Sequence, residues 1–244
     1  MKWAALVCAV LVGGFWSWSP AQDQRYSVAG EASGLRFSGY EWRIKTSGGN
    51  VGPGPNQFGA NAVEVDQRGF LHLRILHYGR KWICGEVYSR RSFGFGEYHF
   101  IVQNAARLDV NAVVGLFIWD SSAAQKFFRE ADIEISRWGD PKNPNGQWVI
   151  QPFVRPGNRV RFELPPTRLE LSFRWSPGKL LFRAAAGATL LHEHLFTKGV
   201  PDPDQENVHL NIWMNNARAP ADGKTEEVVV ESFTYLGLEE RRKP

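Results

Sequence analysis

The chain has 244 residues, and 29 Lys and Arg against 25 Asp and Glu give it a formal net charge of +4. Hydrophobic residues make up 43% and charged residues 22%, which is ordinary for a globular protein and excludes a largely disordered chain. No run of Lys and Arg interleaves with aromatic residues, so nothing in the charge pattern supports a nucleic-acid partner. The 24 Gly, 14 Pro and 10 Trp instead favour short strands joined by turns, with planar side chains suited to flat ligands such as sugars.

The first 21 residues have the pattern of a cleaved signal peptide. Lys2 precedes an apolar run at 3–16, and small residues at 19–21 stand where a signal peptidase cuts. The run is shorter than the roughly 20 apolar residues that a membrane-spanning helix needs, and no later segment has such a run. We therefore expect a secreted or periplasmic protein with no membrane association after cleavage. Cys8 would leave with the signal, so Cys84 would have no partner for an intramolecular disulfide.

Apolar and polar residues alternate with a period of two through most of the remaining chain, as is typical of half-buried β-strands. The clearest segments are residues 69–75, 97–102, 159–164, 169–175 and 226–235. Clusters of Gly, Pro and Asn separate the strands, and no segment has the period of an amphipathic helix. Roughly a dozen strands at this spacing predict an all-β fold, a two-sheet antiparallel β-sandwich, in a single domain over residues 22–244.

Three carboxylates alternate with apolar residues in the segment Glu130-Ala131-Asp132-Ile133-Glu134. A strand would place the acids on one face and the apolar residues on the other, whereas a helix would scatter both sets. Repulsion among the acids raises the pKa of at least one of them, as a general acid requires. A retaining glycosidase needs two carboxyl groups about 5–5.5 Å apart, which this spacing permits. A solvated acidic strand is the alternative at this stage.

This segment resembles the E-x-D-x-E motif of glycoside hydrolase family 16, secreted β-jelly-roll enzymes that include lichenases and laminarinases. Further similarity lies on both sides of it, in residues 61–65, 69–73, 84–89, 93–98, 115–119, 210–213 and 228–233. The resemblance spans nearly all of residues 22–244 and implies a concanavalin A-like jelly roll. It also implies an endo-glycosidase that hydrolyses a β-1,3/1,4-glucan-like polysaccharide by double displacement and requires no cofactor. We expect a monomer.

The resemblance implies a role for each acid: Glu130 as nucleophile, Asp132 as the residue that tunes protonation, and Glu134 as general acid/base. It also implies sugar contacts, in which aromatic rings stack on pyranose faces and polar groups bind hydroxyls. These contacts would come from Glu86, Phe117, Trp119, Phe128, Gln151, Asn211, Trp213 and Asn50. Core positions for the two tryptophans, and turn or sheet-rim positions for Gln151 and Asn50, are the alternatives.

Several positions depart from the family pattern. The cysteine that pairs with the equivalent of Cys84 in lichenases is missing near Asn56, so that loop must be held differently. Tyr88 stands where lichenases have an arginine, which affects the register in which a glucan chain would bind. Many members bind a structural calcium, and here the resemblance implies the carbonyl of Gly69 and the carboxylate of Glu231 as its ligands.

Other motifs give weaker indications. His192 and His194 share one face of a predicted strand but lack a third ligand at recognisable spacing, so structural or surface histidines are favoured over a metal site. No G-x-S-x-G elbow is present, and Gly94-x-Gly96 lacks the third glycine of a dinucleotide-binding loop. Two alternatives to a hydrolase stay open. One is a non-catalytic carbohydrate-binding β-sandwich, and the other is a transglycosylase, in which a sugar hydroxyl replaces water at the covalent intermediate.

Overall fold

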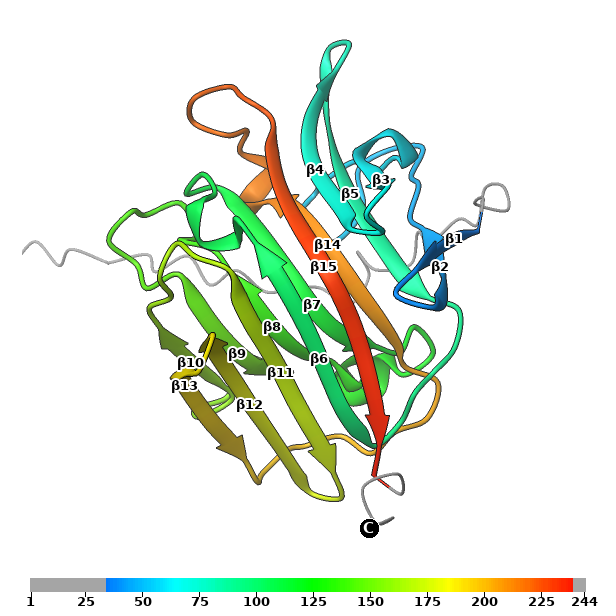
Figure 1. Cartoon of the computed structure of the whole chain (residues 1–244), viewed down its shortest axis with the longest axis vertical. Helices are drawn as coiled ribbons and strands as arrows, with labels where there is room; N and C mark the ends of the chain where they lie inside the picture. Colours follow the sequence, from blue (N-terminus) through cyan, green and yellow to red (C-terminus); the bar gives the residue numbers. More distant parts are fainter. Residues whose placement is uncertain (1–33, 239–244) are drawn as a thin grey trace, which may run out of the picture.

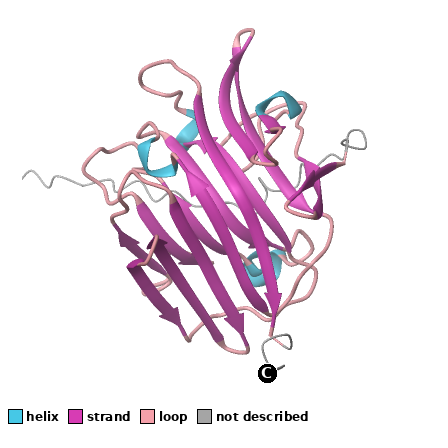
Figure 2. Cartoon of the chain, viewed as in Figure 1, coloured by secondary structure: helices cyan, strands magenta, loops and turns pink. Residues whose placement is uncertain are grey.

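The computed structural model describes residues 34–238 (Figure 1). The predicted signal peptide, residues 1–21, lies outside this range. Strands dominate the described part, and its helices are short 3₁₀ segments (Figure 2). No helix between residues 34 and 238 has the length and apolar character that crossing a membrane requires.

The strands are β1 (Leu35–Phe37), β2 (Tyr40–Ile44), β3 (Val63–Val65), β4 (Leu71–Tyr78), β5 (Lys81–Ser89), β6 (Gly96–Gln103), β7 (Ala112–Trp119), β8 (Ala131–Ile135), β9 (Gly146–Ile150), β10 (Arg159–Phe162), β11 (Leu169–Ser176), β12 (Lys179–Ala186), β13 (Thr189–Phe196), β14 (Asn207–Met214) and β15 (Glu226–Gly237). The 3₁₀ helices are η2 (Ala60–Ala62), η3 (Ala105–Arg107), η4 (Ala124–Arg129) and η5 (Asn215–Ala217).

The strands form two antiparallel layers, which confirms the predicted all-β sandwich. The strand order is β10-β9-β8-β7-β14-β5-β4-β15-β6-β11-β12-β13, with β2 also paired to β5 and β3 to β4. In Figure 1, β15, β6, β11 and β12 form the nearer layer, and β7, β8, β9 and β14 pass behind them. The layers are continuous through β5, whose residues 81–84 pair with β4 and whose residues 85–88 pair with β14.

Aromatic side chains fill the space between the layers. Trp148 on β9 stacks on Phe182 of β12 with ring centroids 5.3 Å apart, so it links the back layer to the front layer. Trp42 meets Phe233 edge-on at 5.5 Å, and both are buried. Truncating a buried aromatic residue of this kind costs about 3–5 kcal/mol. One face of each layer therefore forms a rigid core, and the outer face of the back layer is free to carry polar groups.

Candidate active site

The three predicted catalytic acids lie together on the outer face of the back layer, at β8. Its apolar residues Ala131, Ile133 and Ile135 are at most 1% exposed in the core, so the alternating acids point the other way. Glu130 directly precedes the strand, and its carbonyl accepts a hydrogen bond from the backbone N–H of Gln151 at 3.1 Å. The predicted acid row is thus a strand, as the alternation requires.

Asp132 is the buried middle member of the row. It is hydrogen-bonded to Glu130, and Gln151 Nε2 donates to its Oδ2 at 3.3 Å. Burial raises the pKa of Asp132 well above its usual range, and the charges of Glu130 and Glu134 raise it further. Asp132 is therefore harder to ionise than a free carboxyl, and its hydrogen bond joins it to Glu130.

Glu134 has a different environment at the other end of the row. Burial raises the pKa of its carboxyl to about 7, although the hydrogen bond from Gln147 and the positive charges of Arg161 and Arg159 work in the opposite direction. Gln147 Nε2 donates to Glu134 Oε2 at 2.5 Å. A carboxyl with this pKa exchanges its proton near neutral pH, which is what a general acid/base does.

The neighbouring strands leave room beside Glu134. Gly115 on β7 is its partner across the sheet, and a Cβ at Gly115 would lie 2.6 Å from Oδ1 of Asn211. Only glycine therefore fits between Glu134 and β14. On the other side, Gln147 of β9 is paired with Glu134, which brings its amide within reach. Gln147 was not predicted as a site residue, because its segment Gly146-Gln147-Trp148-Val149-Ile150 does not alternate and its place beside Glu134 follows only from the pairing of β8 with β9.

The backbone immediately before Glu130 has a strained, left-handed conformation. Residues 127–129 all have positive φ, at 52°, 55° and 52°, although none is glycine, and each such residue costs about 1–3 kcal/mol. The buried Arg129 guanidinium holds this segment. Its Nε donates to Asp120 at 3.0 Å, and its other nitrogens donate to the Asp204 carboxylate at 2.8 Å and to the carbonyl of Asp202 at 2.7 Å. These bonds fix the backbone immediately before the predicted nucleophile.

Aromatic rings line the β7 and β14 side of the acid row. Phe117 is paired with Asp132 across the sheet, and Trp119 stacks on Phe128 with centroids 5.1 Å apart. Trp213 meets Trp138 edge-on at 6.0 Å. The predicted sugar contacts Phe117, Trp119, Phe128 and Trp213 are all partly exposed, although Trp213 also packs against the core. Phe117 stacks on His209 and Trp119 stacks on Phe128, so these rings form a stacked aromatic group beside the carboxylates.

Glu86 and Asn211, also predicted as sugar contacts, belong to a buried cluster. Each is 1% exposed. Glu86 accepts hydrogen bonds from Lys45 Nζ at 3.0 Å, His209 Nδ1 at 3.0 Å and Asn211 Nδ2 at 3.2 Å. We name these four residues the buried charge cluster. The Glu86 carboxylate is covered by protein donors and joins strands of the sheet, while the sugar contacts of Glu86 and Asn211 stay predictions.

Charge compensation explains how the buried charge cluster tolerates an ionised acid. Burial alone would raise the pKa of Glu86, but the Lys45 charge and the hydrogen bond from His209 outweigh it and lower the pKa to about 2. Burial lowers the pKa of His209, whose ring stacks between Phe117 at 4.9 Å and Tyr88 at 5.3 Å. A neutral His209 thus stacks with Phe117 and Tyr88 as a third ring. The sequence analysis missed it, although it stands two residues before Asn211 on one strand.

The two predicted amide contacts have different surroundings. Gln151 lies beside the acids, where it binds Asp132 and so acts on the protonation of the row. Asn50 is exposed in the loop that follows β2, and no contact recorded within residues 34–238 links it to the acid row. The sugar contact of Asn50 stays a prediction.

Cys84 is a buried, free cysteine. Burial raises the pKa of its thiol to about 12, which fits a packing role and not that of a nucleophile. Its Sγ donates to Asn56 Oδ1 at 3.6 Å, and Asn56 Nδ2 donates to the carbonyls of Pro53 at 2.8 Å and Met214 at 3.0 Å. The Asn56 side chain therefore holds this loop through hydrogen bonds.

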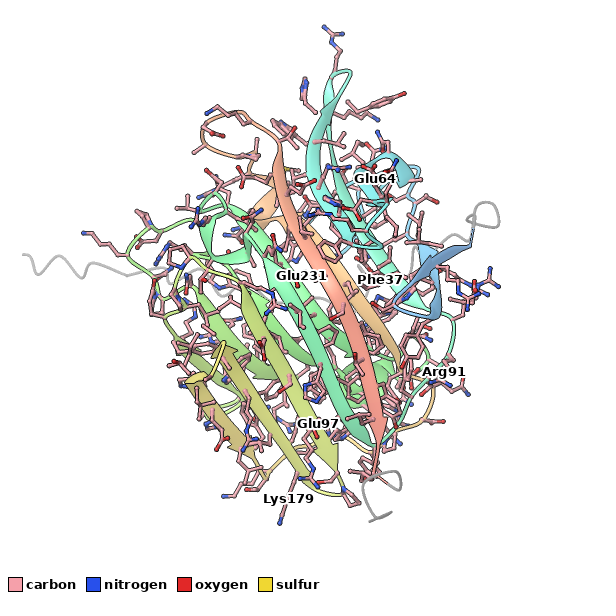
Figure 3. All side chains as sticks on the ribbon, in the orientation of Figure 1. Phe37, Glu64, Arg91, Glu97, Lys179 and Glu231 are labelled. Carbon is pink, nitrogen blue, oxygen red and sulfur yellow. The ribbon has the colours of Figure 1, made fainter. Side chains whose placement is uncertain are left out.

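The candidate calcium ligands lie away from the acid row, and their surroundings do not suit the ion. Gly69 is in the turn between β3 and β4, and Glu231 is on β15 of the front layer (Figure 3). The Glu231 carboxylate accepts hydrogen bonds from Arg168 Nε at 2.9 Å and from Gln103. Within residues 34–238 no group of three or more His, Cys, Asp or Glu side chains could hold a metal ion. Calcium takes about six to eight oxygens, so these residues do not fit it.

Comparison with known proteins adds the fold family. No protein-family model matches the sequence, and no curated protein matches it. Solved structures do match. The β-glucanase of Bacillus licheniformis is 19% identical, with a TM-score of 0.60 over 85% of this chain and 98% of that one. A family 16 glycoside hydrolase of Bacteroides ovatus with the product G4G4G3G is 11% identical, with a TM-score of 0.61 over 85% and 98%.

A third neighbour has a different description. An immunostimulatory antigen of Mycobacterium tuberculosis, called a pseudo β-1,3-glucanase, is 17% identical, with a TM-score of 0.57 over 80% of this chain and 90% of that one. At these identities the comparisons establish the fold. The structural neighbours are β-glucanases of glycoside hydrolase family 16, and the predicted jelly-roll sandwich is confirmed.

Proposed function

We propose that this protein is an exported retaining endo-glycosidase that hydrolyses internal bonds of a β-linked polysaccharide. The observation that carries the proposal is the divergence within the acid row. Burial and the neighbouring charges make Asp132 hard to ionise and it is hydrogen-bonded to Glu130, while the pKa of Glu134 is about 7. Two carboxyl groups with separate protonation states are what a glycosidase needs.

The reaction would proceed in two displacements. Glu130, hydrogen-bonded to Asp132, attacks the anomeric carbon as a carboxylate while Glu134 gives its proton to the leaving glycosidic oxygen. Glu134 is then a carboxylate and takes a proton from water, which attacks the covalent glycosyl-enzyme from the opposite side. The hydrogen bond from Gln147 keeps the Glu134 carboxyl in place during both steps. Two inversions give net retention.

The aromatic side of the row supports a sugar substrate. Phe117, Trp119 and Trp213 offer ring faces for the C–H surfaces of pyranoses. Neighbours described as β-1,3-1,4-glucanases support a β-glucan-like backbone. The expected signal peptide, a leader for export, supports action outside the cytoplasm, and we expect a monomer.

One alternative has a specific observation in its favour. A structural neighbour described as a pseudo β-1,3-glucanase keeps this fold, which supports a non-catalytic carbohydrate-binding sandwich as the second candidate. A transglycosylase would use the same acids and differ only in the acceptor. The intact acid row favours catalysis over binding alone, because buried acids that repel one another carry a cost that a lectin does not need.

The test is release of reducing ends from mixed-linkage β-glucan, laminarin, xyloglucan and agarose by the wild type and by Glu130→Gln. We expect cleavage by the wild type only, with the β-anomer formed first in ¹H NMR of the product. Glu193→Gln is the matched control, because Glu193 is an exposed carboxylate of the front layer, paired with Arg183. Equal glycan binding by the wild type and Glu130→Gln, with no cleavage, would favour the binding module. Added oligosaccharide acceptors that yield longer products would indicate the transglycosylase.

A further inference from the structure

The two sides of the acid row differ in chemistry. The β7 and β14 side is aromatic, whereas the β9 and β10 side carries arginines. Arg159 and Arg161 alternate on β10, where Arg161 is paired with Gln147 and Arg159 with Val149. Gln147 is in turn paired with Glu134. Because paired residues of neighbouring strands point to the same face, both guanidinium groups lie on the face of the acids.

Within the described chain no carboxylate contacts either guanidinium group directly, although the Glu134 charge acts on Arg161 from a distance. Among residues 34–238, neither Arg159 nor Arg161 forms an ion pair. Arg161 Nε donates to the amide oxygen of Gln147 at 2.9 Å and its guanidinium lies over the ring of Trp138, 5.8 Å from the centroid. Arg159 lies over Phe153 at 5.5 Å. Both charges lower the pKa of Glu134, so their positive potential reaches the site.

A second basic region lies at the Glu130 end of the row. A cavity of about 270 Å³ opens there, and its polar lining residues are the cations Lys126, Arg129 and Arg155, the acids Glu130 and Asp202, and Gln151. The Arg155 guanidinium lies 5.3 Å from the ring centroid of Phe127. Within the described chain neither Lys126 nor Arg155 has a carboxylate partner, whereas the Arg129 charge is engaged by Asp120 and Asp204. Cations therefore flank the carboxylates at both ends, on one side.

The arginines on the β9 and β10 side would add little to the affinity for a neutral glucan. Guanidinium groups bind sulfate and carboxylate groups through paired, charge-assisted hydrogen bonds, which neutral hydroxyls do not provide. The acid row itself repels an anionic chain, so a cleft for an anionic polysaccharide needs cations beside its catalytic acids. Arginines supported by aromatic rings are pre-organised for this, because stacking limits the conformations of a long side chain.

We propose that the cleft takes a β-linked polysaccharide that carries anionic groups, either sulfate esters or uronic acid carboxylates, and that Arg155, Arg159 and Arg161 bind those groups. This inference rests on the proposed function for the location of the sugar chain. It adds the substrate class: the backbone lies against the aromatic side, and the anionic groups face β10 and the cavity beside Glu130.

The test measures binding apart from cleavage, in the Glu130→Gln background, by isothermal titration calorimetry and affinity electrophoresis. The probes are laminarin and mixed-linkage β-glucan, each in its neutral form, a sulfated form and a form oxidised at C6 to the uronic acid. We expect the preferred anionic form to bind about tenfold more tightly than its neutral parent, with a preference that falls as NaCl rises. Comparison of the sulfated and oxidised forms identifies the group.

Two double variants decide whether the arginines are responsible. Arg155→Gln/Arg159→Gln should abolish the anionic preference and leave the affinity for neutral glucan within about twofold. Arg174→Gln/Arg183→Gln removes the same charge from exposed positions of the front layer and should keep the preference. Both changes are at exposed residues, and unaltered melting temperatures confirm that the variants fold. Arg161→Gln is made separately, because Arg161 also orients Gln147.

Each outcome separates this inference from the proposed function. Equal affinity for neutral and anionic probes overturns the inference, and if the wild type still cleaves neutral glucan, the glycosidase proposal stands. If both double variants lose the anionic preference equally, the preference comes from the net charge of the protein, and this result also overturns the inference. An anionic preference that needs Arg155 and Arg159, without cleavage of any probe by the wild type, supports the inference and refutes catalysis.

Discussion

Replacing Glu134 with glutamine should stabilise the protein above pH 7. Burial raises the pKa of this carboxyl from 4.5 to about 7, so the folded chain holds its proton more tightly than the unfolded chain does. Between these two pH values the unfolded chain releases its proton first, and stability falls as pH rises. At about 1.4 kcal/mol for each pKa unit, the full cost above pH 7 is at most about 3.5 kcal/mol.

Urea unfolding at pH 5 and pH 8 measures this cost. The free energy of unfolding of the wild type should fall by about 2–3 kcal/mol more than that of Glu134→Gln between the two pH values, because glutamine does not titrate. Glu170→Gln is the control, since Glu170 is an exposed carboxylate on β11 of the front layer and its loss should leave the pH dependence unchanged. Parallel pH dependence in the wild type and Glu134→Gln would refute the reasoning, because the Glu134 carboxyl would then be no harder to ionise in the fold than in the unfolded chain.

Three further predictions concern the site and its support. The value of kcat/KM should fall about tenfold per pH unit above pH 7, where Glu134 loses the proton it must donate, and a flat pH profile to pH 9 would assign the acid elsewhere. Lys45→Met leaves the buried Glu86 carboxylate without its cation and should cost about 3–5 kcal/mol in urea unfolding, whereas adding Glu86→Gln should recover part of that loss. Gly115→Ala places a Cβ 2.6 Å from Asn211 Oδ1 and should cost about 1–3 kcal/mol, and a melting temperature equal to that of the wild type would show that β7 can shift without penalty.

Most of the strands can be predicted from the local alternation of polar and apolar residues. The segments predicted at 97–102 and 169–175 match β6 and β11 to within one residue at each end. The acid row could be placed because its apolar residues need the core, which forces the carboxylates to the opposite face. Period-two patterns therefore report which side chains share a face.

The partners of a buried polar residue follow from sheet order, which local patterns do not contain. The family resemblance assigned Glu86 to sugar binding, and no local pattern in residues 84–89 indicates its hydrogen-bond partners. Glu86 binds Lys45, which directly follows β2, and His209 on β14. Both partners come within reach only when β2 and β14 pair with β5. The left-handed backbone of residues 127–129 was equally out of reach, because Phe-Phe-Arg has no preference for positive φ. Three hydrogen-bonded partners of Arg129, up to 75 residues away, impose it.

The position of β14 decides when the fold can form during synthesis of the chain. It lies between β5 and β7 in the middle of the back layer, and its His209 reaches Glu86 across 123 residues of chain. A growing chain that has not yet reached residue 207 therefore lacks the strand that joins its earlier halves, and its Glu86 has no imidazole to bind. Contacts this distant are formed late, because the entropy lost in closing the loop must be offset first. We expect fragments that stop before β14 to stay unfolded, so the site exists only once nearly the whole chain has been made.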